Sequence, residues 1–138
     1  MQPVLLDTGV IYALLDRREW AHEKCIRALE NLHRPLITCE AVIMESCYLL
    51  RRSPQAVQSV IANVESGLFT IPFQLSRSAP QVQAILNKYH DTPADFADAC
   101  LIQMADELDT GDILTLDSDF VHYRWRKTRR FRMLIPLD

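Results

Sequence analysis

Short apolar runs alternate along the chain with longer segments in which apolar side chains recur at helical spacing. The short runs are bounded by polar or turn-forming residues, a pattern typical of buried strands. One of them contains Pro72, which cannot donate to a neighbouring strand and therefore indicates a strand at the sheet edge. Strands are predicted at Pro3–Leu6, Pro35–Thr38, Leu68–Phe73, Asp112–Leu116 and Phe131–Ile135.

The intervening segments carry apolar stripes that predict helices. Ser53–Pro54 and Thr92–Pro93 are helix-start signals, with a hydroxyl at the N-cap and proline at the first helical position. Thr92 with Asp95 also has the spacing of a capping box. The stripe of the second helix contains Trp20, Cys25, Ile26, Leu29 and Leu32. Helices are predicted after the turn at Asp7–Gly9 and at Glu19–Leu32, Glu40–Arg51, Pro54–Glu65, Ser78–Tyr89 and Thr92–Leu108.

Alternating strands and helices predict an α/β fold with a mainly parallel central sheet covered on both faces. The chain has 138 residues, 49% of them hydrophobic and three of them glycine. That length fits one domain over residues 1–138, and the composition excludes a disordered or collagen-like chain.

The sequence contains no apolar run long enough to span a bilayer and no signal-peptide core before Asp7. We therefore expect a cytoplasmic protein without a membrane partner. Cysteines stand at positions 25, 39, 47 and 100 without CxxC spacing, which favours buried thiols over a zinc site or disulfides.

Charge is distributed unevenly behind a formal net value of -3. Nine acidic residues and no Lys or Arg lie between Asp91 and Asp119, whereas six basic residues and no acid lie between Phe120 and Arg132. This arrangement suggests a cation site beside a polyanion site. The alternative is a solvated helix face followed by a solvated loop.

Two acids stand directly after predicted buried strands. Asp7 follows Val4–Leu6, and Asp117 follows Ile113–Leu116. The carboxyl edge of a parallel sheet is where ligands bind in open α/β folds. The structural alternative is that each aspartate only caps the next turn or helix.

Two further acids are the only charges in apolar helical windows. Glu45 lies within Ala41–Leu50, and Asp98 lies within Phe96–Ala105. Burying an ionised carboxylate costs roughly several kcal/mol unless a partner compensates its charge. The alternative is that each points along a narrow exposed stripe.

Asp95 and Asp119 are additional candidates with competing explanations. Asp95 lies one turn before Asp98, but a capping role already accounts for it. Asp119 follows Asp117 by two residues and competes with it for the fourth ligand position, or caps the turn at Phe120.

Acids brought together in this way repel each other, and a divalent cation relieves that repulsion. Ligation by oxygen alone favours Mg²⁺ or Mn²⁺ over zinc or copper. Such sites suit phosphodiester hydrolysis, in which one metal activates a water and a second stabilises the leaving oxygen.

Four blocks of the sequence resemble, in order and spacing, the signature blocks of PIN domains, especially the small bacterial proteins that include VapC-type toxins. The blocks are LLDTGVIYALLD (5–16), CEAVIMESCYLL (39–50), DFADACLIQMA (95–105) and ILTLDSDF (113–120). The resemblance implies a Rossmann-like α/β/α sandwich with Mg²⁺- or Mn²⁺-dependent endoribonuclease activity. It places the family's four acids, as catalytic and metal-binding residues, at Asp7, Glu45, Asp98 and Asp117.

The resemblance also implies supporting residues and partners. Thr8 and Thr115 match hydroxyl positions that orient a carboxylate or a metal-bound water, although Thr115 is also an ordinary strand residue. RNA is the expected substrate. An antitoxin protein and a second copy of the chain are the expected partners, since many relatives are toxins of type II toxin–antitoxin pairs and small PIN domains commonly dimerise.

The basic segment offers a candidate RNA contact surface. Aromatic residues (Tyr123, Trp125, Phe131) alternate there with Arg124, Arg126, Arg129 and Arg130. Arginines would guide the RNA backbone and an aromatic ring would stack on a base. The alternative is a solvated loop whose Trp125 packs on the domain edge.

Two other functions use the same residues. A non-catalytic PIN-fold module would bind RNA or protein in EDTA without cutting, but the presence of all four acids disfavours it. A small-molecule phosphohydrolase lacks support because the sequence shows no glycine-rich phosphate loop and no DxD pair after the first strand.

Overall fold

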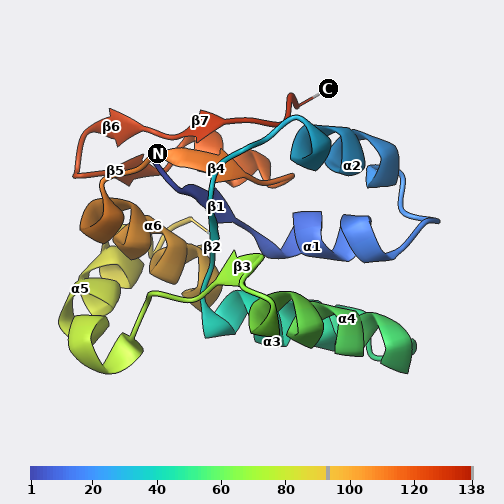
Figure 1. Ribbon diagram of the computed structural model, residues 1–138. Coiled ribbons are helices and arrows are strands. Elements are labelled where there is room, and N and C mark those ends of the chain that lie inside the picture. Colours follow the sequence, from blue (N-terminus) through green and yellow to red (C-terminus); the bar gives the residue numbers. More distant parts are fainter. Residues whose placement is uncertain (93, 138) are drawn as a thin grey trace.

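Five short strands form a sheet of order β3-β2-β1-β4-β7 in which every pairing is parallel. The computed structural model describes residues 1–92 and 94–137, and Figure 1 shows them with α1 and α2 on one side of the strands and α5 and α6 on the other. The mainly parallel α/β architecture predicted from the sequence is confirmed. The strands are β1 (Val4–Leu6), β2 (Leu36–Ile37), β3 (Phe69–Thr70), β4 (Asp112–Leu114) and β7 (Arg132–Met133).

Six α-helices of the described chain connect and flank these strands, together with one 3₁₀ turn, η1. All six correspond to predicted segments, although several are shorter at their ends. They are α1 (Thr8–Leu15), α2 (His22–Glu30), α3 (Glu40–Leu49), α4 (Pro54–Glu65), α5 (Leu75–Lys88) and α6 (Phe96–Leu108); η1 covers Ser118–Val121.

The chain reverses its direction of travel across the sheet between β1 and β4. It adds β2 and β3 on one side of β1, and then crosses to add β4 and β7 on the other. β1 and β4 are therefore adjacent, with Leu5 opposite Ile113 and Leu6 opposite Leu114. A reversal of this kind leaves a crevice at the carboxyl ends of the two strands, and both strands lead into acids there.

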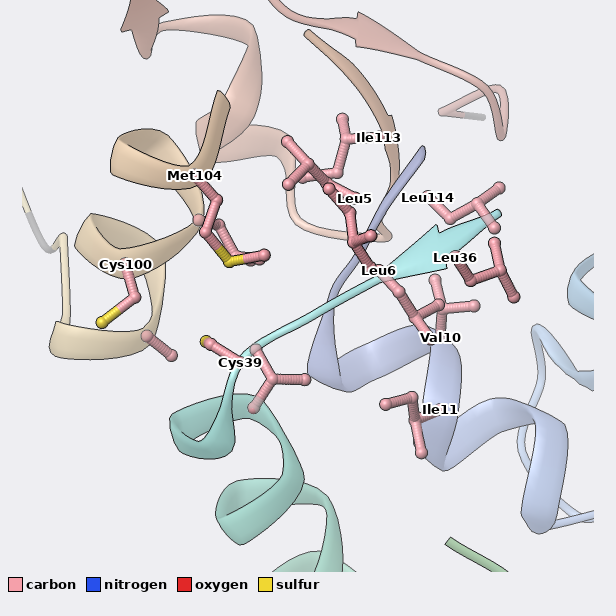
Figure 2. Packing of buried hydrophobic residues seen from close by; sticks show 14 of the residues in the cluster. Leu5, Leu6, Val10, Ile11, Leu36, Cys39, Cys100, Met104, Ile113 and Leu114 are labelled. Atoms are coloured by element: carbon pink, nitrogen blue, oxygen red, sulfur yellow. The ribbon is translucent and has the colours of Figure 1, made fainter. Parts of the chain in front are cut away.

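The core fills the space around β1 and β4. Leu5, Leu6, Ile113 and Leu114 are almost completely buried, and Figure 2 shows them beside Val10 and Ile11 of α1. Figure 2 also shows Met104 and Cys100 of α6 approaching Cys39. All four cysteines are free thiols; Cys25, Cys39 and Cys100 are buried, as predicted, and Cys47 is half-buried.

The start of α4 is as predicted and the start of α6 is not. Ser53 caps α4 by accepting a hydrogen bond from the Ala56 amide at 3.3 Å, with Pro54 at the first helical position. The predicted Thr92 cap of α6 is wrong, because the helix begins at Phe96 and Asp95 is its cap. Pro93, part of the predicted signal, lies outside the described residues.

The second helix also begins later than predicted. α2 starts at His22, so Trp20 precedes it and is 73% exposed instead of lying on the buried stripe. Helical spacing would place Trp20 on the buried stripe only if the helix included Trp20. The residues before His22 form turns, so Trp20 lies outside the helix and off the stripe.

An antiparallel pair, β5 (Arg124–Trp125) and β6 (Arg129–Arg130), was missed by the sequence reasoning. Arg126 and Lys127 turn the chain with positive φ angles of 45° and 68°, which are uncommon for side chains without amide groups. Trp125 packs directly over Gly111, where any side chain would collide with the indole. The tight fit explains why glycine is needed at that position.

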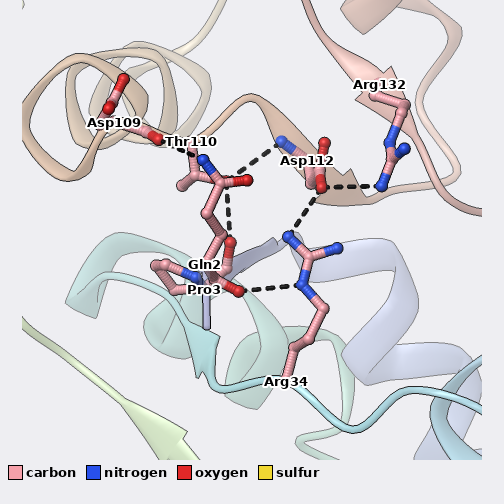
Figure 3. Close-up of polar contacts among 7 residues, drawn as sticks. All are labelled: Gln2, Pro3, Arg34, Asp109, Thr110, Asp112 and Arg132. Atoms are coloured by element: carbon pink, nitrogen blue, oxygen red, sulfur yellow. Dashed lines mark hydrogen bonds and ion pairs between the residues drawn. The ribbon is translucent and has the colours of Figure 1, made fainter.

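At the amino edge of the sheet, charged residues pair with one another (Figure 3). Asp112 accepts from Arg34 at 2.7 Å and from Arg132 at 3.0 Å. The Asp109 carbonyl accepts from Gln2, and its carboxylate pairs with Arg126 at 2.9 Å. These contacts join the starts of β1, β4 and β7.

Among the described residues, no helix combines the length and the apolar character required to cross a bilayer.

Candidate metal centre

Asp7 stands where β1 ends and α1 begins. Its side chain accepts from the Thr8 amide at 2.8 Å and from the Thr115 hydroxyl at 2.7 Å, and only 7% of the residue is exposed. The N-cap role considered as the structural alternative is therefore present. It uses Oδ1, while Oδ2 faces the neighbouring strand end.

Asp117 follows β4 and approaches the same crevice. Its amide donates to the Thr115 hydroxyl at 3.0 Å, and its carboxylate accepts from the Asp119 amide at 2.9 Å. Thr115, which is fully buried, thus connects the two strand-end acids by donating to Asp7 and accepting from Asp117. Asp117, and not Asp119, caps the turn at Phe120.

Asp98 comes from the first turn of α6 and is 6% exposed. Its Oδ2 accepts from the Tyr123 hydroxyl at 3.0 Å. Asp98 also forms a capping box with Asp95, whose Oδ1 accepts from the Asp98 amide at 2.9 Å. The helix start thereby fixes the position of the Asp98 side chain.

Glu45 projects from α3 and is half-buried, which is less than its apolar flanks predicted. Its Oε2 accepts a hydrogen bond from the Thr8 hydroxyl at 3.3 Å. Thr8 therefore links Glu45 to the start of α1, in line with the orienting role that the resemblance implied for that hydroxyl.

One cleft of about 290 Å³ contains the four predicted acids. Its lining residues are Asp7, Thr8, Gly9, Glu45, Asp95, Asp98, Leu116 and Asp117. Carboxylate oxygens of Asp7, Asp98 and Asp117 all lie within 4.8 Å of one another. Glu45 lines the cleft but stands outside this group of three, and Asp119 does not line it. Among the described residues, no Lys, Arg or His lines the cleft.

Burial without a cationic partner raises the pKa values of these acids. Burial raises the pKa of Asp7 to about 6, although hydrogen bonds from Thr115 and Thr8 oppose the shift. Burial, followed by repulsion from Asp95 and Asp7, raises the pKa of Asp98 to about 7. Burial also raises the pKa values of Glu45 and Asp117.

The donor set fits a hard divalent cation. Three carboxylate oxygens from separate elements converge within the span that one ion can bridge, and their mutual repulsion is uncompensated by any neighbouring base. Oxygen ligands and several acidic side chains are what Mg²⁺ and Mn²⁺ prefer in proteins. A cation would restore the ionised forms that burial disfavours.

The predicted RNA-contact segment lies elsewhere. Arg126 binds Asp106 and Asp109 at the carboxyl-terminal end of α6, whereas Asp98 lies at the opposite end of that helix. Arg129 and Arg130 are exposed on the same hairpin, and Arg124 lies against Tyr89 of the α5 end. None of these arginines lines the acidic cleft.

The aromatic residues of that segment are buried, so no free ring face is available for a base. Tyr123 is 0% exposed, and Trp125 and Phe131 are 8% exposed each. Trp125 packs at the domain edge and donates to the Arg130 carbonyl at 3.2 Å, as the structural alternative held. Sequence reasoning missed the contact of Tyr123 with Asp98, because the neighbouring arginines indicated an RNA contact surface or a solvated loop.

Comparisons with known proteins agree with the fold. Residues 4–126 match the family model of the PIN domain. Ribonuclease VapC26 of Mycobacterium tuberculosis is 27% identical over 116 residues, which cover 83% of this chain and 86% of the relative. The crystal structure of M. tuberculosis VapC20, described as a sarcin-ricin loop cleaving toxin, matches with a TM-score of 0.81 at 18% identity, covering 91% of this chain and 98% of that one.

Proposed function

The chain belongs to the PIN-domain family, and we propose that it is a Mg²⁺- or Mn²⁺-dependent endoribonuclease that hydrolyses phosphodiester bonds of RNA. The observation that carries the proposal is the convergence of Asp7, Asp98 and Asp117 at the carboxyl ends of β1 and β4 without a neighbouring base. Two buried acids and one half-buried acid brought together there destabilise the fold by themselves, but they suit the binding of a cation.

Each residue of the cleft has a distinct part in the proposal. Asp7, Asp98 and Asp117 hold the cation, and Glu45 completes the site from α3. Thr115 holds the Asp7 carboxylate and the Asp117 backbone amide in place, and Thr8 holds the Glu45 carboxylate. Asp95 fixes the start of α6, so it orients Asp98 and adds negative charge at the mouth of the cleft.

When bound, the divalent cation supplies Lewis acidity for a water and charge neutralisation for the phosphate. The chain supplies the positions of the oxygens and the exclusion of competing cations, because no lysine or arginine lines the cleft within the described chain. Carboxylates with raised pKa values hold protons near neutral pH until a cation displaces them, so activity should rise with pH.

The names of the relatives support a cellular role as well. VapC26 is named a ribonuclease and VapC20 a toxin, so we extend the proposal to the toxin of a toxin–antitoxin pair acting on RNA in the cytoplasm. An antitoxin and a second copy of the chain are its proposed partners. A short neighbouring reading frame encoding a DNA-binding protein, copurifying with this chain on co-expression, would test the pairing.

The activity is tested by incubating purified protein with RNA in Mg²⁺, Mn²⁺ or EDTA, and repeating the assay with Asp7→Asn. Asparagine keeps the size of Asp7 and its acceptor for Thr8 but removes the charge. We expect cleavage with either metal, none in EDTA, and none with the variant while its circular dichroism is unchanged. Cleavage by the folded variant, or RNA binding without any cleavage in metal, would overturn the proposal.

A further inference from the structure

A second cavity, of about 440 Å³, lies where α1 and α3 end. Residues that follow α1 form one wall and residues that follow α3 form the other, with Ser53 at the start of α4 between them. Four arginines line the cavity against a single acid, Asp16. The arginines are Arg17, Arg18, Arg51 and Arg52.

Most of this positive charge is not neutralised by acids among the described residues. Arg18 pairs with Asp16 at 3.4 Å, and Asp16 also accepts from the Tyr12 hydroxyl. Arg51 stacks on the Tyr48 ring at 4.1 Å and donates to the Tyr48 carbonyl. Within the described residues, Arg17 and Arg52 make no ion pair, and both are exposed.

The cavity is close to the acidic cleft because the same two helices border both. α1 begins at Thr8 in the cleft and ends at Leu15 in the cavity, a path of about 12 Å. On α3, Glu45 lines the cleft and Leu49 lines the cavity, one turn or about 6 Å further on. Figure 1 shows α1 running away from the sheet.

We propose that the arginine cavity binds the phosphodiester backbone of the RNA substrate beside the acidic cleft, an inference that rests on the ribonuclease function proposed above. Guanidinium groups present planar sets of donors that match phosphate oxygens. A strand that crosses both sites would place one phosphate among the acids and others among the arginines. The positive cavity also offsets the repulsion that the acidic cleft exerts on any polyanion.

A direct test measures binding without cleavage. Fluorescence anisotropy of a fluorescein-labelled, mixed-sequence single-stranded RNA is recorded in EDTA over a range of salt concentrations. The variants are Arg17→Gln/Arg18→Gln and Arg51→Gln/Arg52→Gln, which remove two charges from either wall. The matched control, Arg27→Gln/Arg77→Gln, removes two exposed arginines from α2 and α5.

Each cavity variant should bind the RNA about tenfold more weakly, and the slope of log K against log salt should fall by about 0.7 per lost contact. The control should change by less than about twofold, because general charge contributes little through the screening of physiological salt. Thermal melts and gel filtration of each variant should be used to check that folding and oligomeric state are unchanged.

Three results would overturn the proposal: an equal loss in the control, a loss only in Arg129→Gln/Arg130→Gln of the hairpin, or displacement of RNA by polyglutamate with tighter binding of that peptide. Failure of the ribonuclease function is distinguishable, since it appears as absent cleavage in metal while the EDTA binding pattern of the cavity variants persists.

Discussion

The acids at the two edges of the sheet have different partners. At the amino edge, Asp112 lies between Arg34 and Arg132 (Figure 3), and Asp109 pairs with Arg126. At the carboxyl edge, the three converging aspartates have hydroxyl and amide donors as partners and no base lines their cleft among the described residues. Asp112 and Asp109 at the amino edge therefore have basic partners, whereas the three aspartates at the carboxyl edge have none among the described residues.

This difference separates acids that stabilise the fold from acids that serve a function. Both groups follow or precede the same strands, so position in the sequence alone does not distinguish them. The acids of the amino edge have arginine partners, whereas Asp7 and Asp98, which have no basic partner among the described residues, have raised pKa values and would be compensated by a cation. The comparison predicts that mutations at the two edges will have opposite consequences.

The largest effect is expected from Asp98→Asn at the carboxyl edge. The substitution removes a proposed ligand charge and should reduce Mg²⁺-dependent RNA cleavage by at least about 100-fold, since even outer-shell changes cost 10–100-fold. The melting temperature of the metal-free variant should equal or exceed that of the unmodified chain, because a buried repulsive charge is gone. Gel-based cleavage rates and calorimetric melts measure the two. A destabilised variant that still cleaves would contradict the comparison.

The reverse outcome is expected from Asp112→Asn at the amino edge. The change leaves Arg34, whose side chain is 20% exposed, without its carboxylate at 2.7 Å. Unfolding in urea should show a loss of about 1–3 kcal/mol. Cleavage of RNA by the folded variant should stay within a factor of about two of the unmodified chain, because Asp112 contacts no cleft residue. If RNA cleavage falls by more than the loss of folded protein explains, the amino edge contributes to activity and the comparison is wrong.

A smaller effect is expected from pH and metal removal. In EDTA, the folded chain holds protons on Asp7 and Asp98 up to pH values of about 6 and about 7, whereas the unfolded chain releases them near 3.8. These two groups therefore make stability fall as pH rises through that window. The melting temperature at pH 7.5 should rise by about 5 °C with saturating Mg²⁺, which binds the folded state.

The control for this titration is the Asp7→Asn/Asp98→Asn variant. It should lose most of the dependence on pH between about 4 and 7, with a remainder from Glu45 and Asp117, and it should lose the response to Mg²⁺. A variant that retains the full slope would show that other groups are responsible, and the assignment of the raised pKa values to the cleft would be wrong.

Sequence reasoning identified the parts of the molecule that local patterns determine. Asp7 and Asp117 were found because a predicted buried strand ends directly before each, although β4 itself ends at Leu114, and Asp98 was found because its helical window is otherwise apolar. Ser53 was identified as a cap from its proline neighbour. Each of these inferences needed only a few adjacent residues.

Contacts between distant segments were not predictable in this way. The arginines after Phe120 indicated an RNA contact surface. In the structure Trp125 is buried against Gly111, so the hairpin packs near the amino edge of the sheet. Arg17 and Arg52 are separated by 34 intervening residues and share a cavity only after α1 and α3 pack together. α6 begins at Phe96, later than predicted, because Asp95 and Asp98 form the capping box at its start.

The smallest effect tests whether the donors around the acids tune them. Tyr123 donates to Asp98 and lowers its pKa against the effect of burial. Tyr123→Phe keeps the ring among Phe120 and Tyr89, at centroid distances of 4.9 and 5.0 Å, and removes only the hydroxyl. The pKa of Asp98 should rise further, so the Mg²⁺ concentration for half-maximal cleavage at pH 7 should increase about tenfold.

That increase should shrink at pH 8.5, where Asp98 is ionised with or without the hydroxyl. Tyr89→Phe is the matched control, because its hydroxyl accepts from the Arg124 amide at 3.0 Å in the same aromatic group and contacts no acid of the cleft. An equal change in both variants, or a change independent of pH, would show that the ring packing matters and the hydroxyl does not. A change confined to Tyr123 and to the lower pH would show that the carboxyl edge relies on neutral donors where the amino edge uses arginine.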